Sequence, residues 1–295
     1  IWCKAIEERK ARVLADAGFD MDLDGADSHS VQYQNANNSV RLSDEFMEAV
    51  ESDAEWALRS VATGEVLRTV RARELLHQIA EAAWECADPG VQFSSTINRW
   101  HTASVTGPIN ASNPCSEYLH LDDSACNLAS LNLLSFLDEH GEFDIDGFAH
   151  AVNITLIAQE ILVGNADYPT EAIGETTRRF RQLGLGYANL GALLMALGLP
   201  YDSEAGRGWA GSVGAVMTGA AYRTSAHLAE RLGPYAGFAE NREPQLGVLR
   251  AHRKALAGLS TLQSSTALNA AAAAAWDEAI EMGDRVGGRN AQVSV

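Results

Sequence analysis

The chain has 295 residues, of which 46% are hydrophobic and 21% are charged, and its formal net charge at pH 7 is −17. This composition excludes disordered and collagen-like chains, and no unbroken run of about 18 apolar residues is present to span a bilayer. The negative charge repels a phosphate backbone, so we expect no nucleic-acid polymer as a partner.

Hydrophobic spacing predicts a mixed α/β chain whose second half is mostly helical. The predicted helices cover residues 2–17, 72–86, 148–162, 173–197, 210–232 and 265–282. Ser43 is the predicted N-cap of a further helix. A strand broken by a polar turn is expected over 30–41, a hairpin within 52–70, and a strand-like alternation at 290–295. An acidic loop over 20–27 and a long loop from 88 to the segment around Cys115 complete the pattern.

The chain contains no fixed-period repeat and no Pro/Ser-rich linker, which favours one α/β domain over residues 1–295, or part of one. It begins at Ile1 without a methionine, so we expect an internal piece of a longer polypeptide. Three glycines, Gly184, Gly186 and Gly191, interrupt the apolar pattern of 173–197. The third comes too late for a dinucleotide-binding loop, so close helix packing is the expectation.

The four cysteines are too few for a secreted disulfide scaffold, and no signal segment precedes them. They are Cys3, Cys86, Cys115 and Cys126. A lone cysteine is most often a buried structural thiol, which is the expectation for Cys3 and Cys86. A reducing, cytoplasmic environment is therefore expected.

The segment that carries chemistry is Asn113-Pro-Cys-Ser-Glu117. Pro114 favours an extended conformation of the residue before it, and alternate side chains of an extended chain share one face. Asn113, Cys115 and Glu117 would then lie roughly 6–7 Å apart on that face, from a rise of about 3.3 Å per residue. A thiol, a carboxylate and an amide would converge on one small molecule.

A carboxylate beside a thiol raises the pKa of the thiol, which works against a nucleophilic thiolate. A thiol that must remain protonated and exchange a hydrogen atom is not impaired, and Glu117 can still move a proton on a substrate hydroxyl. The combination favours radical chemistry over acyl transfer. Cys126 offers a second sulfur that could supply electrons by forming a disulfide.

Several stretches resemble the ribonucleotide reductases, specifically the adenosylcobalamin-dependent class II enzymes. They are residues 32–41, 83–90, 113–118, 122–133, 168–174, 181–191 and 289–292. The resemblance covers essentially the whole chain. It implies part of a ten-stranded α/β barrel in which the radical cysteine lies on a central loop.

By this resemblance Cys115 would be the thiyl-radical cysteine that removes the ribose 3′-hydrogen. Glu117 would accept the 3′-hydroxyl proton, and Asn113 would hydrogen-bond the substrate hydroxyls. Cys126 would be one of two redox cysteines, whose partner lies upstream of this chain in the family. The implied substrate-binding residues are Ser112, Asn113, Pro114, Cys115, Ser116 and Glu117. The implied effector (specificity) loop is Gln32, Tyr33, Gln34, Asn35, Ala36 and Asn37.

The resemblance also implies a cofactor and partners. These are adenosylcobalamin (vitamin B12), a ribonucleoside diphosphate substrate, a deoxynucleoside triphosphate effector, a thioredoxin-type or dithiol reductant and a second copy in a homodimer, with no membrane. The family's upstream substrate segment, its Pro-Thr-Gly-Thr phosphate segment, most cobalamin contacts and its Cys-x-x-Cys shuttle have no match here, so we expect the central portion of a longer enzyme.

Three alternatives stay open from the sequence. The chain could be a class I large subunit, which shares the Asn-x-Cys-x-Glu core but takes its radical from a metal-containing partner. It could be an inactive nucleotide-binding remnant. A zinc site built from Cys115, His120 and Cys126 with Asp122 or Asp123 matches no usual ligand spacing, so we expect no metal site.

Overall fold

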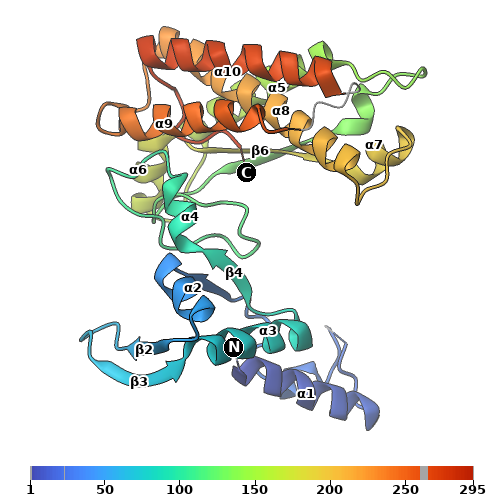
Figure 1. The fold of residues 1–295 in the computed structure, drawn as a ribbon, viewed down its shortest axis with the longest axis vertical. Coiled ribbons are helices and arrows are strands. Elements are labelled where there is room, and N and C mark those ends of the chain that lie inside the picture. Colours follow the sequence, from blue (N-terminus) through green and yellow to red (C-terminus); the bar gives the residue numbers. More distant parts are fainter. Residues whose placement is uncertain (1, 23, 260–264, 295) are drawn as a thin grey trace. The chain divides into compact units, whose positions relative to one another are not determined.

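The structure is a computed structural model that describes residues 2–22, 24–259 and 265–294. The chain divides into two compact units. Unit 1 comprises Ile1–Arg99 together with Pro114–Ser116, and unit 2 comprises Trp100–Asn113 together with Glu117–Val295. Figure 1 shows the elements of each unit.

Unit 1 combines a parallel strand pair, a hairpin and several helices. Its elements are α1 (Trp2–Asp16), the 3₁₀ helix η1 (Ser28–Ser30), β1 (Ser39–Leu42), α2 (Asp44–Glu51), β2 (Glu55–Arg59), β3 (Val66–Arg71), α3 (Ala72–Cys86), β4 (Gly90–Phe93) and α4 (Ser94–Arg99). β1 pairs with β4 in parallel, with Arg41 opposite Gln92. β2 and β3 form the predicted antiparallel hairpin.

A small apolar core holds unit 1 together. Ser43 caps α2 as predicted, because its side chain accepts a hydrogen bond from the backbone N–H of Phe46. The capped helix buries Phe46 and Val50 against Leu42 of β1 and Ile79 of α3. This hydrophobic contact anchors β1, the strand that carries Arg41, to the core of unit 1.

Unit 2 contains a parallel strand pair covered by long helices. Its elements are β5 (Asn127–Asn132), the 3₁₀ helix η2 (Leu133–Phe136), α5 (Ile145–Asn165), α6 (Glu171–Phe180), β6 (Leu183–Ala188), α7 (Leu190–Ala196), α8 (Glu204–Leu232), α9 (Phe238–Leu256) and α10 (Thr266–Val286). β5 and β6 are parallel over their full lengths, and α5 and α6 connect them. This arrangement is the β-α-β unit of α/β proteins, so the predicted α/β class is confirmed, although neither strand of the unit was predicted.

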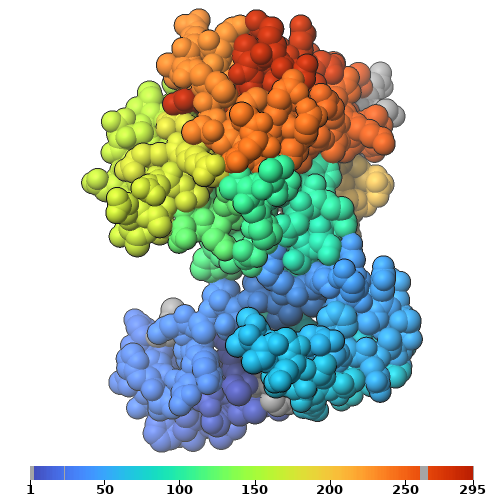
Figure 2. Space-filling model, turned by 90° about the vertical axis from the view of Figure 1, so that its left-hand side faces the viewer, coloured from blue at the N-terminus to red at the C-terminus, as the bar shows by residue number. Residues whose placement is uncertain are grey.

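The core of unit 2 is built in layers. α5 packs on β5 and β6, α8 packs on α5, and α10 packs along α8. Leu183 and Leu185 of β6 are fully buried, and Trp276 of α10 is 1% exposed. In the space-filling view the orange and red atoms of α9 and α10 pack closely against each other (Figure 2). Unit 2 therefore has one large hydrophobic core, and a second, smaller cluster lies around Phe180 and Tyr235.

α5 is the one described helix long and apolar enough to cross a membrane by length and composition. Polar residues interrupt the helix, so it contains no unbroken apolar run. Its inner face is buried in unit 2 and includes Glu160 within an ion-pair network. Its outer face leaves Ile154 and Ile161 more than half exposed.

Helix predictions from apolar spacing are confirmed for α1, α3, α5, α8 and α10, with small shifts at their ends. The predicted loop after residue 88 is wrong at its start, because β4 and α4 occupy residues 90–99. Both elements are short, and β4 gains its hydrogen bonds from β1, about 50 residues earlier. Over residues 30–41 only β1 is a strand.

Three predictions in the second half are also corrected. Residues 183–188, expected within a helix, form β6, so Gly184 and Gly186 lie in a strand and not at a helix contact. No helix was expected where α9 forms, because Pro244 and many charges obscure the apolar spacing there. Residues 290–294 make irregular hydrogen bonds to Phe180 and Leu183 without a strand ladder among the described residues.

Candidate active site

The predicted site segment, residues 112–117, forms a tight turn. Its turn residues are 114 and 115, and Ser116 has a φ of 66°, in the left-handed region. The backbone N–H of Tyr118 donates to Oδ1 of Asn113 at 3.0 Å. The expectation of an extended chain with alternate side chains on one face is therefore wrong. Proline restricts only the residue before it, so the residues after it remain free to turn.

The tip and the flanks of this turn belong to different units. Pro114, Cys115 and Ser116 group with unit 1, and Ser112, Asn113 and Glu117 group with unit 2. The Cys115 side chain is exposed and carries a free thiol.

Within unit 1, the hydroxyl of Ser116 accepts a hydrogen bond from Nε2 of Gln92 at 2.8 Å. Gln92 is 5% exposed, and its Oε1 accepts from Nη1 of Arg41 at 2.8 Å. The residue next to the Cys115 thiol is therefore fastened to the paired strands β1 and β4. Neither Arg41 nor Gln92 was recognised from the sequence. A polar residue between the apolar Val91 and Phe93 was the available signal.

Within unit 2, Glu117 lies close enough to Cys126 for its charge to act on the thiol. Burial, and then the negative charge of Glu117, raises the pKa of Cys126 to about 11. The thiol therefore stays protonated at neutral pH. Oε2 of Glu117 is buried and has no hydrogen-bond partner among the described residues. A carboxylate with an uncommitted oxygen beside a protonated thiol can accept a proton from a substrate hydroxyl.

Cys126 immediately precedes β5, and the start of that strand is held on two sides. The backbone N–H of Ala125 donates to Oγ1 of Thr177 in α6 at 3.0 Å. The side chain of Gln159 in α5 donates to the carbonyls of Asn127 and Gly184, at 2.9 and 3.1 Å. These bonds tie β5, β6 and α5 together next to the sulfur.

Tyr118 links the site turn to the segment that leads to Cys126. Its hydroxyl lies 2.8 Å from Oγ of Ser124, and its ring stacks near His120, with ring centroids 6.4 Å apart. His120 in turn lies edge-on to His101, at 5.2 Å. Both histidines are 3% exposed, and burial lowers the pKa of His101 to about 4 and that of His120 to about 3. Both imidazoles are therefore neutral at physiological pH.

The stretch 289–292 of the sequence resemblance forms a buried polar network in unit 2. Nε of Arg181 and Nε of Arg289 each lie 2.6 Å from Oε1 of Glu160. Asn290 donates to the other carboxylate oxygen at 2.7 Å and accepts from Ser225 at 2.9 Å. The network joins α5, the C-terminal end of α6, α8 and the segment after α10.

The predicted effector loop, residues 32–37, lies in unit 1 against α1. The backbone N–H of Gln32 donates to Oε2 of Glu7 at 3.0 Å, and the Lys4 ammonium donates to the carbonyl of Ala36. The loop lines a cavity of about 480 Å³ with Tyr33, Gln34, Asn35 and Ala36. Its polar residues thus face a space large enough for a small ligand.

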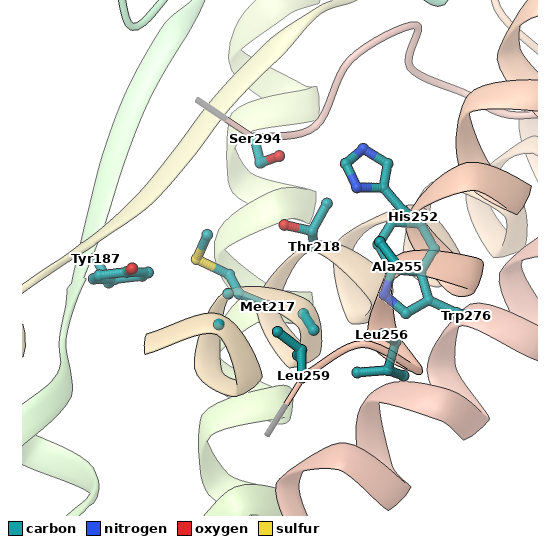
Figure 3. A pocket seen from close by; sticks show the side chains of 12 residues that line it. Tyr187, Met217, Thr218, His252, Ala255, Leu256, Leu259, Trp276 and Ser294 are labelled. Carbon is teal, nitrogen blue, oxygen red and sulfur yellow. The ribbon is translucent and has the colours of Figure 1, made fainter. Parts of the chain in front are cut away.

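A separate apolar cavity of about 360 Å³ lies in unit 2 (Figure 3). Tyr187 of β6, Met217 and Thr218 of α8, His252 of α9 and Trp276 of α10 line it. The His252 ring stacks on Trp276 with an interplanar angle of 13°, and burial lowers the pKa of His252. None of the predicted site residues lines this cavity.

Residues 2–22, 24–259 and 265–294 contain no group of three or more His, Cys, Asp or Glu side chains that could hold a metal ion. The zinc alternative therefore has no ligand set in this part of the chain. Cys86 behaves as a structural thiol, because its sulfur donates to the carbonyl of Ala82 at 3.2 Å. The same expectation is wrong for Cys3, which is exposed.

Residues 19–295 match the family described as "Ribonucleotide reductase, barrel domain". The chain is 54% identical to the vitamin B12-dependent ribonucleotide reductase of Streptomyces clavuligerus, over 99% of the chain and 31% of that protein. It is 48% identical to the protein of the same name from Rhodopirellula baltica, over 100% of the chain and 28% of that protein. A Mycobacterium tuberculosis protein named vitamin B12-dependent ribonucleoside-diphosphate reductase is 35% identical over 72% of the chain and 31% of its own length. The chain thus spans less than a third of the length of these relatives.

Proposed function

Because the chain belongs to the ribonucleotide reductase barrel-domain family, we propose that it forms the central part of the catalytic chain of a vitamin B12-dependent ribonucleotide reductase. The observation that carries the proposal is an exposed Cys115 thiol followed two residues later by Glu117, whose buried Oε2 has no hydrogen-bond partner among the described residues. The full enzyme reduces the 2′ position of ribonucleotides and so supplies DNA precursors.

The proposed chemistry uses three side chains of the site turn. Cys115, as a thiyl radical, removes the 3′-hydrogen of the ribose and later returns it. Glu117 accepts the proton of the 3′-hydroxyl through its buried, uncommitted oxygen. Asn113 already accepts a backbone hydrogen bond at Oδ1, so it meets the substrate as a donor through Nδ2.

The electrons come from two thiols. The 2′-hydroxyl leaves as water, a hydrogen takes its place, and two cysteines together lose two electrons and two protons as they form a disulfide. Cys126 is one of these cysteines. The other belongs to the part of the enzyme outside this sequence, and a thioredoxin-type or dithiol reductant restores both thiols between turnovers.

The residues present fit a cobalamin cofactor. Cobalamin holds its cobalt in its own ring, so it requires an accessible Cys115 rather than a cluster of protein metal ligands, and Cys115 is exposed. When bound, adenosylcobalamin supplies the radical that removes the hydrogen atom from this thiol. The names of the relatives favour this cofactor over the metal-containing partner protein of class I enzymes.

The remaining partners follow from the same proposal. The substrate is a ribonucleoside diphosphate, as the name of the Mycobacterium tuberculosis relative indicates for that protein. Residues 32–37 belong to the site of a deoxynucleoside triphosphate effector, supported by the cavity that residues 33–36 line. The enzyme works as a homodimer in the cytoplasm.

The test is a reduction assay on the full-length enzyme with adenosylcobalamin and a dithiol. We expect Cys115→Ala to abolish product formation and substrate-dependent cleavage of the cobalt–carbon bond. Cys126→Ser should still allow radical chemistry at the ribose but should block repeated turnover. Ordinary turnover by Cys115→Ala would contradict the mechanism. Effector binding by the full-length wild type without any reduction would favour the nucleotide-binding remnant instead.

A further inference from the structure

The tip of the site turn has a backbone that needs support. Ser116 follows Cys115 directly and has a φ of 66°. A residue with a side chain is disfavoured in this left-handed region, so surrounding contacts must hold it there. The peptide plane between Cys115 and Ser116 moves with Ser116, and the position of the thiol depends on that plane.

A directional chain of hydrogen bonds within unit 1 supplies the support. Arg41 has only N–H donors, so its Nη1 can bind Gln92 only through the Oε1 oxygen, at 2.8 Å. The amide nitrogen of Gln92 must then point the other way. It donates to Oγ of Ser116 at 2.8 Å, so Arg41 sets which end of the Gln92 amide faces the turn.

The supporting residues stand on a fixed part of the fold. Arg41 and Gln92 are direct partners in the parallel register of β1 and β4. Leu42, the next residue of β1, is 5% exposed within the core of unit 1. Gln92 is itself 5% exposed, so water has little access to compete for its hydrogen bonds.

We propose that Gln92, oriented by Arg41, is a positioning residue for the Cys115 thiol. It acts through Ser116 and holds the turn in the conformation from which Cys115 reaches the ribose. The inference rests on the proposed function for the role of Cys115, but the hydrogen-bond chain itself can be tested without catalysis. Because catalysis depends steeply on the placement of reacting atoms, we expect a loss in kcat and not in substrate binding.

The first experiment is hydrogen–deuterium exchange on the full-length enzyme without cofactor or substrate. Gln92→Met keeps the length of the side chain but removes its donor and acceptor. We expect the peptide over residues 114–118 to exchange at least about tenfold faster, while peptides from α2 and α3 stay unchanged. The matched control is Gln78→Met, at an exposed residue of α3, which should change none of them. An unchanged rate over 114–118 in Gln92→Met would overturn the inference.

The second experiment measures nucleotide reduction by the same enzymes. We expect Gln92→Met and Ser116→Ala each to lower kcat by about tenfold or more, and Gln92→Met to leave KM within about twofold. The double variant should be no slower than the worse single variant, because both changes break the same Gln92–Ser116 hydrogen bond. Additive losses, or a change in KM alone, would show that Gln92 does not act through Ser116.

The two proposals fail in distinguishable ways. A wild-type enzyme that does not reduce ribonucleotides contradicts the proposed function, while faster exchange in Gln92→Met would still support the positioning of the turn. A wild-type enzyme that reduces them, with a Gln92→Met variant equal to it in both exchange and kcat, contradicts the positioning role and leaves the function intact.

Discussion

The two parallel strand pairs of the molecule are built alike but stabilised differently. In unit 2, β5 and β6 are covered by α5, and Leu183 and Leu185 are fully buried. In unit 1, β1 and β4 have a small core at Leu42, but Val91 is 42% exposed and Phe93 is 51% exposed. Parallel strands are usually buried on both faces. β6 follows this rule at Leu183 and Leu185, whereas β5 is open on one face, where Leu128 is 63% exposed, and β4 is open at both Val91 and Phe93.

The two strand pairs therefore have different roles, one in stability and one in holding the site turn. The stability of unit 2 comes from burial of apolar surface and from one buried ionic network. The β1–β4 pair instead presents Arg41 and Gln92, which hold the turn that carries Cys115. Substitutions in β6 should therefore act mainly on folding, and substitutions on the polar face of β4 should act mainly on the site.

The largest effect is expected from removing the carboxylate that joins the buried network. Glu160→Ala leaves the Arg181 and Arg289 side chains, 12% and 20% exposed, without their shared anion. Breaking a buried ion pair from one side typically costs about 3–5 kcal/mol. Urea unfolding, followed by exchange of peptides from unit 2, measures the loss.

A matched control for this prediction is the exposed Arg99–Asp44 pair of unit 1. Arg99→Ala should leave the unfolding transition unchanged, because exposed pairs contribute little. If Glu160→Ala also left the unfolding transition unchanged, the network would have no stabilising role. The two units would then differ only in how much apolar surface they bury.

The next largest effect compares the strands directly. Leu185→Ala in β6 removes a fully buried side chain, and a loss of about 2–5 kcal/mol is expected from the lost burial and the remaining cavity. Val91→Ala in β4 removes a side chain that is 42% exposed, so a change within about 0.5 kcal/mol is expected. Peptide-resolved hydrogen exchange measures the change in the free energy of unfolding for both variants. A large loss from Val91→Ala would show that the open face of β4 is covered in solution.

Acid should weaken unit 2 through its buried histidines. The pKa values of His101 and His120 are lowered to about 4 and about 3 in the folded chain, against an ordinary value of 6.5. Their neutral forms are therefore favoured by folding, so this stability is present above pH 6.5 and is lost as the pH falls toward 4. Each of the two histidines should lower the free energy of unfolding by about 2 kcal/mol between pH 7 and pH 5.

The variant His120→Leu tests the direction of this pH dependence. It breaks no hydrogen bond of the ring, because neither ring nitrogen of His120 has a hydrogen-bond partner among the described residues. The difference in unfolding free energy between pH 7 and pH 5 should shrink by about 2 kcal/mol. His77→Leu, at an exposed residue of α3, is the control and should keep the pH dependence of the wild type. An undiminished pH dependence in His120→Leu would mean that this imidazole does not titrate on unfolding.

Long periodic elements were predictable because their signal is local. Apolar residues at helical spacing identified α3, α8 and α10, and a serine before an acidic turn identified the start of α2. β4 and β6 were not predictable from their own residues, because their hydrogen bonds go to β1 and β5, which are distant in the sequence. Burial at tertiary contacts also overrides Pro244 within α9.

The residues of the candidate site were predictable by type, but their geometry was not. The order Asn113, Cys115, Glu117 and the later Cys126 indicated radical chemistry, and in the structure the charge of Glu117 acts on the Cys126 thiol. The turn at Ser116 had no sequence signal, since a left-handed residue is usually glycine or asparagine. The role of Gln92 depends on the turn and on the β1–β4 register together, so single-residue patterns could not reveal it.

The smallest expected effect tests whether the two units open separately. Ser43 caps α2 in unit 1 and Ser203 caps α8 in unit 2, and each side chain accepts a backbone N–H three residues on, at 3.3 and 3.0 Å. Replacing either by alanine should cost about 1 kcal/mol. In hydrogen exchange, Ser43→Ala should speed opening only in peptides of unit 1, and Ser203→Ala only in peptides of unit 2. If either variant sped exchange equally in both units, the chain would unfold as one cooperative body, and the stability of β6 would then also set the persistence of the Cys115 turn.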